Sequence, residues 1–138
     1  MFMAARFRIL CVDDSTEMLR TLQIVLRRAG HQVHTARNGD EAIALLRALS
    51  DVDVIIVNAR MRGMSGMALV KYIAEESGLD SAGIVLNSPG SVLDLPIQHV
   101  AWGRVDVCLP QPFQAVELYD AVFEAFSRRR GYLYRLAL

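Results

Sequence analysis

Apolar and polar positions along this chain follow two periods, one typical of buried strands and one typical of helices. The strongest run is Val52–Asn58, which is rich in valine and isoleucine and ends in a side-chain amide. An apolar run of this length predicts a strand buried on both faces, at the centre of a parallel sheet. Gly63 and Gly66 lie in the loop that follows, and an apolar helix then extends to Gly78. We take this strand as the element around which the fold is organised.

Other apolar runs predict further strands, each followed by residues at helical spacing. They cover residues 7–12, 32–36, 84–87 and 105–109. The polar residues within the run 32–36 indicate that this strand lies nearer an edge of the sheet. Right-handed crossovers would put the helices on both faces of a parallel sheet. Five βα units without a glycine-rich first loop favour a flavodoxin-like α/β fold, a doubly wound (βα)5 sandwich with strand order 2-1-3-4-5.

Capping residues predict where the first two helices begin and end. Asp14 or Ser15 is expected to cap the first helix, and Gly30 to end it. The second helix is expected to begin with Asp40 as its cap, after a turn at Asn38.

The second half of the chain is less regular. Pro96 interrupts the segment 91–103, so we expect a loop and then a short helix with Pro96 at its first position. The last helix is predicted from Ala115 to Arg128.

Length and composition indicate one globular domain. The chain has 138 residues, of which 53% are hydrophobic and 22% charged. Fifteen basic and fifteen acidic residues cancel, which argues against nucleic-acid and membrane-surface partners. No apolar run approaches the roughly 20 residues of a membrane helix, so a cytoplasmic location is expected. Cys11 and Cys108 both lie in apolar runs and are expected to be buried thiols rather than a disulfide.

Two smaller groups of residues invite a functional interpretation. Arg128–Arg130 and the tyrosines that follow resemble a nucleic-acid patch, but cations also complement the end of a helix, which is the interpretation we favour. The spacing of His31, His34 and His99 is not that of a metal site, and each is expected on a surface or loop.

Polar side chains gather where the predicted strands end. They are Asp13, Asp14, Asn58, Asn87, Ser88 and Gln111. In the order 2-1-3-4-5 the first and third strands are neighbours, so the two carboxylates and the Asn58 amide would share one cleft. Oxygen ligands of this kind suit Mg²⁺, although Asp13 and Asp14 serve equally well as caps of the first helix.

The motifs I-L-C-V-D-D-S, N-A-R-M-R-G-M-S-G and L-P-Q-P-F give the chain a specific likeness. It resembles the receiver domain of two-component response regulators over residues 6–128, which leaves 129–138 as a C-terminal tail. The resemblance implies that Asp13 and Asp14 hold Mg²⁺ and that a carboxylate at position 58 accepts a phosphoryl group from a histidine kinase. It also implies that a hydroxyl at position 87 and a lysine at position 111 contact the phosphoryl oxygens.

The chain departs from that pattern at the residues that carry the chemistry. Asn58 has no anionic oxygen and cannot act as the phosphoacceptor nucleophile. Gln111 lacks the ammonium group that stabilises the phosphoryl charge. The remaining departures are Asn87 at the switch hydroxyl (with Ser88 as an alternative hydroxyl), Cys108 at the switch aromatic, and Arg62 in place of a proline.

These departures also bear on the metal. The site keeps two formal negative charges instead of three, and Arg60 and Arg62 bring positive charge close to it. We expect no required cofactor and, at most, weak Mg²⁺ binding by Asp13, Asp14 and Asn58 beside Arg60. The resemblance further implies a cis peptide bond between Gln111 and Pro112.

The sequence thus predicts a non-enzymatic signalling module of a two-component phosphorelay that has lost its phosphoacceptor and acts through protein contact. The expected surface runs from Ser88 through the fifth strand and the last helix. Expected partners are a histidine kinase, an output protein, or a second copy across the face of the fourth strand and last helix. Two alternatives stay open, an orthodox receiver carrying an engineered Asn58 and a receiver-like domain whose amides bind a small molecule.

Overall fold

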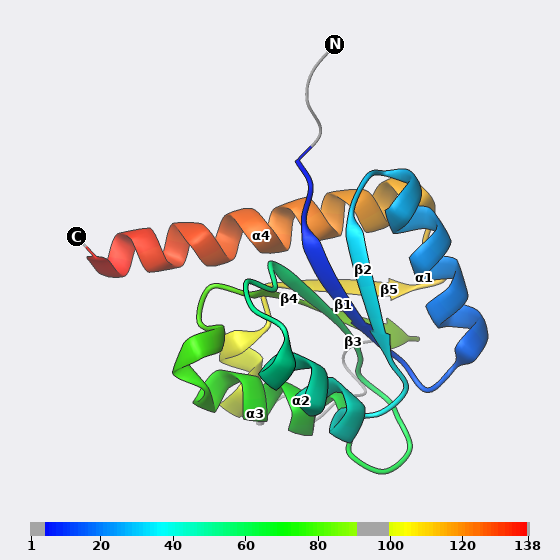
Figure 1. Cartoon of the computed structure of the whole chain (residues 1–138), viewed down its shortest axis with the longest axis horizontal. Helices are drawn as coiled ribbons and strands as arrows, with labels where there is room; N and C mark the ends of the chain where they lie inside the picture. The colour runs from blue at the N-terminus through cyan, green and yellow to red at the C-terminus, as the bar shows by residue number, and fades with distance from the viewer. Residues whose placement is uncertain (1–4, 91–99, 138) are drawn as a thin grey trace.

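The computed structural model describes residues 5–90 and 100–137. A five-stranded parallel sheet in the order β2-β1-β3-β4-β5 forms its centre (Figure 1). The strands are β1 Arg8–Val12, β2 Gln32–Ala36, β3 Val54–Asn58, β4 Gly83–Pro89 and β5 Val107–Gln111. The flavodoxin-like order predicted from the sequence is confirmed.

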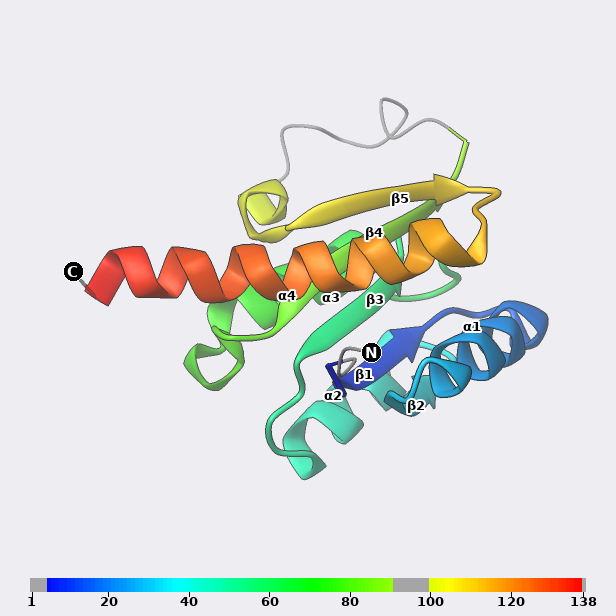
Figure 2. The ribbon, with the colours of Figure 1, turned by 90° about the horizontal axis from the view of Figure 1, so that it is seen from above.

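Helices cover both faces of this sheet (Figures 1 and 2). They are α1 Thr16–Arg28, α2 Gly39–Ala48, α3 Gly66–Glu75 and α4 Ala115–Ala137, with short 3₁₀ turns η1 Ser77–Leu79 and η3 Val100–Arg104. Alternate strand residues feed two apolar clusters because successive side chains point to opposite faces. One cluster packs under α2 and α3, the other under α1 and α4.

Local hydrogen bonds from capping side chains determine where α1 and α2 begin. Ser15, one of the two residues expected to do so, caps α1. Its hydroxyl accepts a hydrogen bond from the Met18 N–H at 3.2 Å. Gly30 follows the end of α1 with a φ of +96°, which favours glycine. The prediction that Asp40 caps the second helix is wrong. Asn38 does so, because its side-chain oxygen accepts from the Glu41 N–H at 2.8 Å.

The last strand begins two residues later than predicted. Asp106, expected inside the strand, instead uses Oδ2 to accept the Ile84 N–H at 2.8 Å, so the ladder of β5 starts at Val107. Cys11 is buried as expected, but Cys108 is exposed, because β5 is an edge strand; both thiols are free.

Two further expectations concern the end of the chain and its irregular segment. The last helix does not stop at Arg128 but continues to Ala137, and its final turns extend past the sheet (Figures 1 and 2). The predicted short helix at Pro96 falls outside the described residues. Within the described ranges, no helix is both long and apolar enough to span a membrane.

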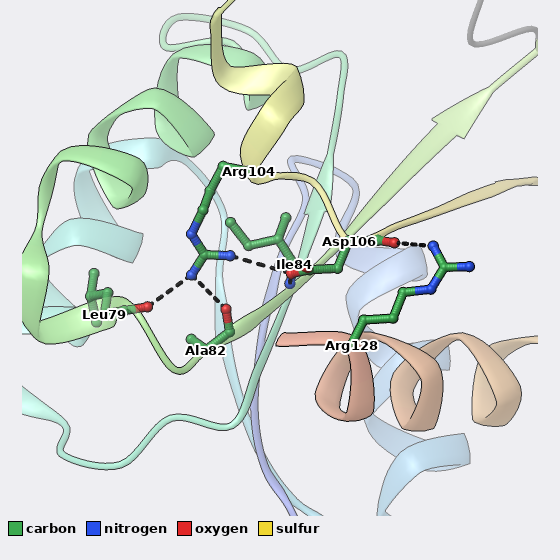
Figure 3. A network of polar contacts seen from close by, with 6 residues as sticks. All are labelled: Leu79, Ala82, Ile84, Arg104, Asp106 and Arg128. Carbon is green, nitrogen blue, oxygen red and sulfur yellow. Dashed lines mark hydrogen bonds and ion pairs between the residues drawn. The ribbon is translucent and has the colours of Figure 1, made fainter. Parts of the chain in front are cut away.

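A buried polar network holds the edge of the sheet where the strands begin (Figure 3). Arg104 donates from Nη2 to the carbonyls of Leu79 and Ala82 at 2.8 and 2.6 Å, and from Nη1 to Asp106 at 3.3 Å. Arg128 of α4 donates to the backbone carbonyl of Asp106 at 2.9 Å. The network therefore joins η1, η3, β5 and α4 at the edge opposite the predicted site.

Candidate functional site

The carboxyl ends of β1 and β3 bring two of the predicted site residues into contact. Asn58 Nδ2 donates a hydrogen bond to Asp13 Oδ1 at 3.2 Å. Strands β1 and β3 are adjacent, so these two side chains meet at the point where the strand order reverses. The position that the resemblance assigns to the phosphoacceptor therefore holds a hydrogen-bond donor that contacts a carboxylate.

Asp13 is almost fully buried, with 1% of its surface exposed. Its Oδ1 also accepts the Ser15 N–H at 2.9 Å, so one oxygen receives two protein donors. Burial raises the pKa of the Asp13 carboxyl, while the hydrogen bonds from Ser15 and Asn58 act in the opposite direction. The amide of Asn58 thus stabilises a carboxylate that burial disfavours.

Asn58 also orders the loop that follows β3. Its Oδ1 accepts the Arg60 N–H at 3.0 Å. Its backbone oxygen lies so close to Gly66 that a Cβ there would be 2.0 Å away, so the start of α3 requires glycine. Asp14 accepts the Arg62 N–H at 3.1 Å, which ties the same loop to the end of β1.

These contacts allow a test of whether the residues fit Mg²⁺. A divalent cation needs several free oxygen donors, but Asp13 Oδ1 and Asp14 Oδ2 already accept backbone N–H groups, and the amide presents Nδ2 rather than an oxygen to Asp13. No cluster of three or more carboxylate, histidine or cysteine side chains suited to a metal is found in the described part of the chain. This donor set does not fit a tight Mg²⁺ site.

Asn87 is the neighbour of Asn58 across the β3–β4 ladder. Since adjacent strand residues face opposite ways, Asn87 rather than Ser88 lies on the same side of the sheet as Asn58. Asn87 is 1% exposed, and neither its Oδ1 nor its Nδ2 has a hydrogen-bond partner within residues 5–90 and 100–137. The Ser88 hydroxyl, also buried, donates to the Pro89 carbonyl at 3.4 Å.

Gln111 ends β5, and the peptide bond between Gln111 and Pro112 is cis, as the resemblance implied. Gln111 lines a largely apolar hollow of about 430 Å³. The other lining residues are Met18, Thr21, Pro89, Gly90, Pro112 and Phe113. The described contacts of Asp13 and Asn58 do not include Gln111, so the structure does not join all of the predicted site residues.

Sequence reasoning missed two parts of the site. It did not foresee the backbone N–H groups of Ser15 and Arg62 as donors to the carboxylates, because a backbone donor leaves no mark on residue type. It also missed the α1 wall of the hollow, formed by Met18 and Thr21, since these residues look like ordinary helix positions.

The fold, the paired aspartates after β1 and the cis-proline after β5 together define a class of protein, the receiver domains of bacterial signalling. Residues 9–123 match the model of the response regulator receiver domain family. The chain belongs to this family, whose members act in two-component signalling with histidine kinases and output domains.

Individual relatives support the same assignment. The chain is 33% identical over 116 residues to the DNA-binding transcriptional regulator NtrC of Salmonella typhimurium, covering 84% of this chain and 24% of NtrC. A chemotaxis protein CheY homolog of Campylobacter jejuni is 38% identical over 80 residues, covering 57% of this chain and 62% of the homolog. The chain spans about half of YrkP of Bacillus subtilis and a quarter of NtrC.

Among solved structures, Vibrio cholerae CheY4 superposes with a TM-score of 0.79 at 26% identity, covering 88% of this chain and 99% of CheY4. A receiver domain from Clostridium thermocellum gives the same TM-score at 23% identity, over 90% of this chain and 97% of that one, and supports the fold alone.

Proposed function

We propose that this chain is a receiver domain that signals without accepting a phosphoryl group. The observation that carries this proposal is the hydrogen bond from Asn58 Nδ2 to Asp13 Oδ1, 3.2 Å long, where the family has a nucleophilic carboxylate. An amide supplies no anionic oxygen to attack phosphorus, and Gln111 supplies no positive charge to stabilise the transferred group. Mg²⁺ binding would be weak, since one oxygen of each aspartate already accepts a protein N–H group and only two formal negative charges remain.

The proposed output is a protein contact through the surface from Ser88 along β5 to α4. Two features of the described residues support it. The 430 Å³ hollow at Gln111 and Phe113 is mainly apolar, and the side chains of Val116 and Phe123 on α4 are 56% and 59% exposed. Exposed large apolar groups on one helix are typical of an interface. The partner would be a histidine kinase, an output protein or a second copy of this chain.

A phosphorylation assay tests the proposal. The wild-type chain and Asn58→Asp are incubated with acetyl phosphate and Mg²⁺, and intact mass is measured. We expect no mass increase for the wild type. A phosphorylated wild-type chain would overturn the proposal.

The variant result separates the remaining possibilities. Uptake by Asn58→Asp alone would mean that the pocket is intact except for its acceptor, as in an orthodox receiver with an engineered asparagine. No uptake by either chain would mean that Gln111 and Asn87 have removed the site's ability to hold a phosphoryl group.

A small-molecule function is the second candidate, and the buried amide of Asn87 is the observation that favours it. Neither of its polar atoms has a partner among the residues that the structure describes, and a neutral hydrogen-bonding ligand would supply one. Thermal-shift screening of the wild type against Asn87→Val tests this idea. A ligand that stabilises the wild type but not the variant would support it, and a ligand that stabilises both equally would count against it.

A further inference from the structure

A row of stacked side chains connects the end of α1 to the C-terminal half of α4, far from the candidate site. The buried Phe7 ring lies 5.2 Å from the ring of His31 at an interplanar angle of 4°. Phe7 also stacks on Phe126 of α4, with ring centroids 4.4 Å apart. The guanidinium of Arg130 lies over Phe126 at 4.9 Å. We call His31, Phe7, Phe126 and Arg130 the aromatic row.

A hydrogen bond to His31, the first member of the aromatic row, favours its neutral state. His31 Nδ1 accepts the backbone N–H of Phe7 at 3.0 Å. Only a neutral imidazole offers a ring nitrogen as an acceptor, because both nitrogens of the protonated ring carry hydrogen. Protonation at Nδ1 therefore removes the bond and places two donors against each other.

We propose that His31 is a proton-sensitive clasp for α4, in which protonation breaks the bond to Phe7 and loosens the stacking of Phe126 and Arg130. The change passes through contacts already described and requires no ligand. It concerns the end of the molecule opposite Asn58, so it stands or falls independently of the proposed loss of phosphorylation.

Charged groups of both signs surround His31. A hollow of about 810 Å³ beside it is lined by the following charged or titratable groups: Arg6, Arg8, Arg27, His34, Asp51 and Asp53. On the α4 side the nearest charge of the row is Arg130, whose Nη2 pairs with Asp53 Oδ1 at 3.1 Å. A protonated His31 would lie near four guanidinium groups, those of Arg6, Arg8, Arg27 and Arg130. The Asp53 carboxylate already accepts hydrogen bonds from Arg130 and from the Arg8 N–H.

Burial has the largest influence and lowers the pKa of His31, while the nearby charge of Asp53 acts in the other direction. A base whose pKa is lower in the folded than in the unfolded state costs stability when it is protonated. The contribution is fully present above the unfolded value of about 6.5 and is lost as pH falls from there towards the folded pKa. The clasp is therefore closed at neutral pH and opens on acidification.

A pH titration by NMR tests the clasp. The imidazole signals of His31 and the backbone amide signals of Phe126 and Arg130 are followed from neutral to acidic pH. We expect the α4 amides to shift with the same midpoint as His31, at a pH below about 6.5. Amides of α4 that do not move with His31 would overturn the proposal.

Variants at three positions test this pathway. In His31→Phe the ring is kept but the proton is lost, so the α4 response should vanish; His31→Gln serves the same purpose if the phenylalanine variant does not fold. In Phe126→Leu, His31 should still titrate while Arg130 no longer follows. His34→Gln is the matched control, because His34 lines the same hollow but does not bond to Phe7, and its response should equal that of the wild type. A response that persists in both His31 variants, or that disappears in His34→Gln, would refute the clasp.

Discussion

Asn58 Nδ2 donates to Asp13 Oδ1 at 3.2 Å, so the amide that ends β3 is the hydrogen-bond partner of the carboxylate that follows β1. A receiver of the usual kind holds carboxylates at both positions and needs a cation to relieve their repulsion. Here the Asn58 amide donates to Asp13 where a second carboxylate would repel it, and it offers no anionic oxygen.

Restoring the acid should reverse this relationship. Asn58→Asp places a second carboxylate against Asp13, and we expect a loss of about 1–3 kcal/mol in the free energy of unfolding without Mg²⁺. Added Mg²⁺ should recover much of the loss in the variant and do little for the wild type, as measured by urea unfolding. Asn38→Asp is the control, since either residue caps a helix well. Equal stabilisation of wild type and variant by Mg²⁺ would contradict the argument.

The unpaired amide of Asn87 should cost stability. Asn87→Val removes two buried polar atoms without partners and adds a β-branched side chain to a buried strand. We expect a gain of about 1 kcal/mol in the free energy of unfolding. Asn58→Val provides the contrast, because it strips a hydrogen-bonded amide from Asp13 and should destabilise. A loss of stability in Asn87→Val would show that this amide has a partner.

Gly66 should tolerate no side chain. A Cβ at this position would lie 2.0 Å from the Asn58 carbonyl oxygen, so Gly66→Ala forces apart the end of β3 and the start of α3. We expect a loss of about 2–3 kcal/mol by denaturant unfolding. Gly78→Ala is matched in chemistry but meets nothing within 4 Å, and should change stability by less than about 0.5 kcal/mol. Similar losses in the two variants would exclude this steric explanation.

The buried Arg104–Asp106 pair should be sensitive to removal of one partner. Arg104→Met leaves Asp106 without its cation and the carbonyls of Leu79 and Ala82 without their donor, with an expected cost of about 3–5 kcal/mol. Arg37→Met removes an exposed guanidinium 3.8 Å from Glu41 and should cost less than about 1 kcal/mol. Chemical denaturation compares the two, and a small effect at Arg104 would mean that water replaces its bonds.

The buried carboxyl of Asp13 should make the difference in free energy of unfolding between wild type and Asp13→Asn depend on pH. Burial raises the pKa of Asp13, so the folded state holds the proton more tightly than the unfolded state. Wild-type stability should therefore fall relative to the variant as pH rises from about 3.8 through the raised pKa, and then level off. Unfolding curves of both proteins across this range measure the difference. A wild-type stability that rises relative to the variant with increasing pH would contradict the assignment.

Much of the fold was predictable because it depends on short-range pattern. The unbroken apolar run before Asn58 and the alternation of strands with helical spacing indicated a parallel sheet, and the absence of a glycine-rich first loop favoured its strand order. The errors concerned element ends and the exposure of Cys108. Asn38 rather than Asp40 caps α2, and β5 begins after Asp106, since competing hydrogen bonds of similar energy decide such boundaries.

The sequence by itself determined which side chains end the strands, and hence that position 58 carries an amide and position 111 no charge. It could not determine that Asn58 donates to Asp13, that Asn87 is buried without a partner, or that His31 and Phe126 meet on one phenylalanine. Those relationships join residues far apart in the chain. Only the packing of helices against a twisted sheet brings them within the few ångströms over which hydrogen bonds and ring stacking act.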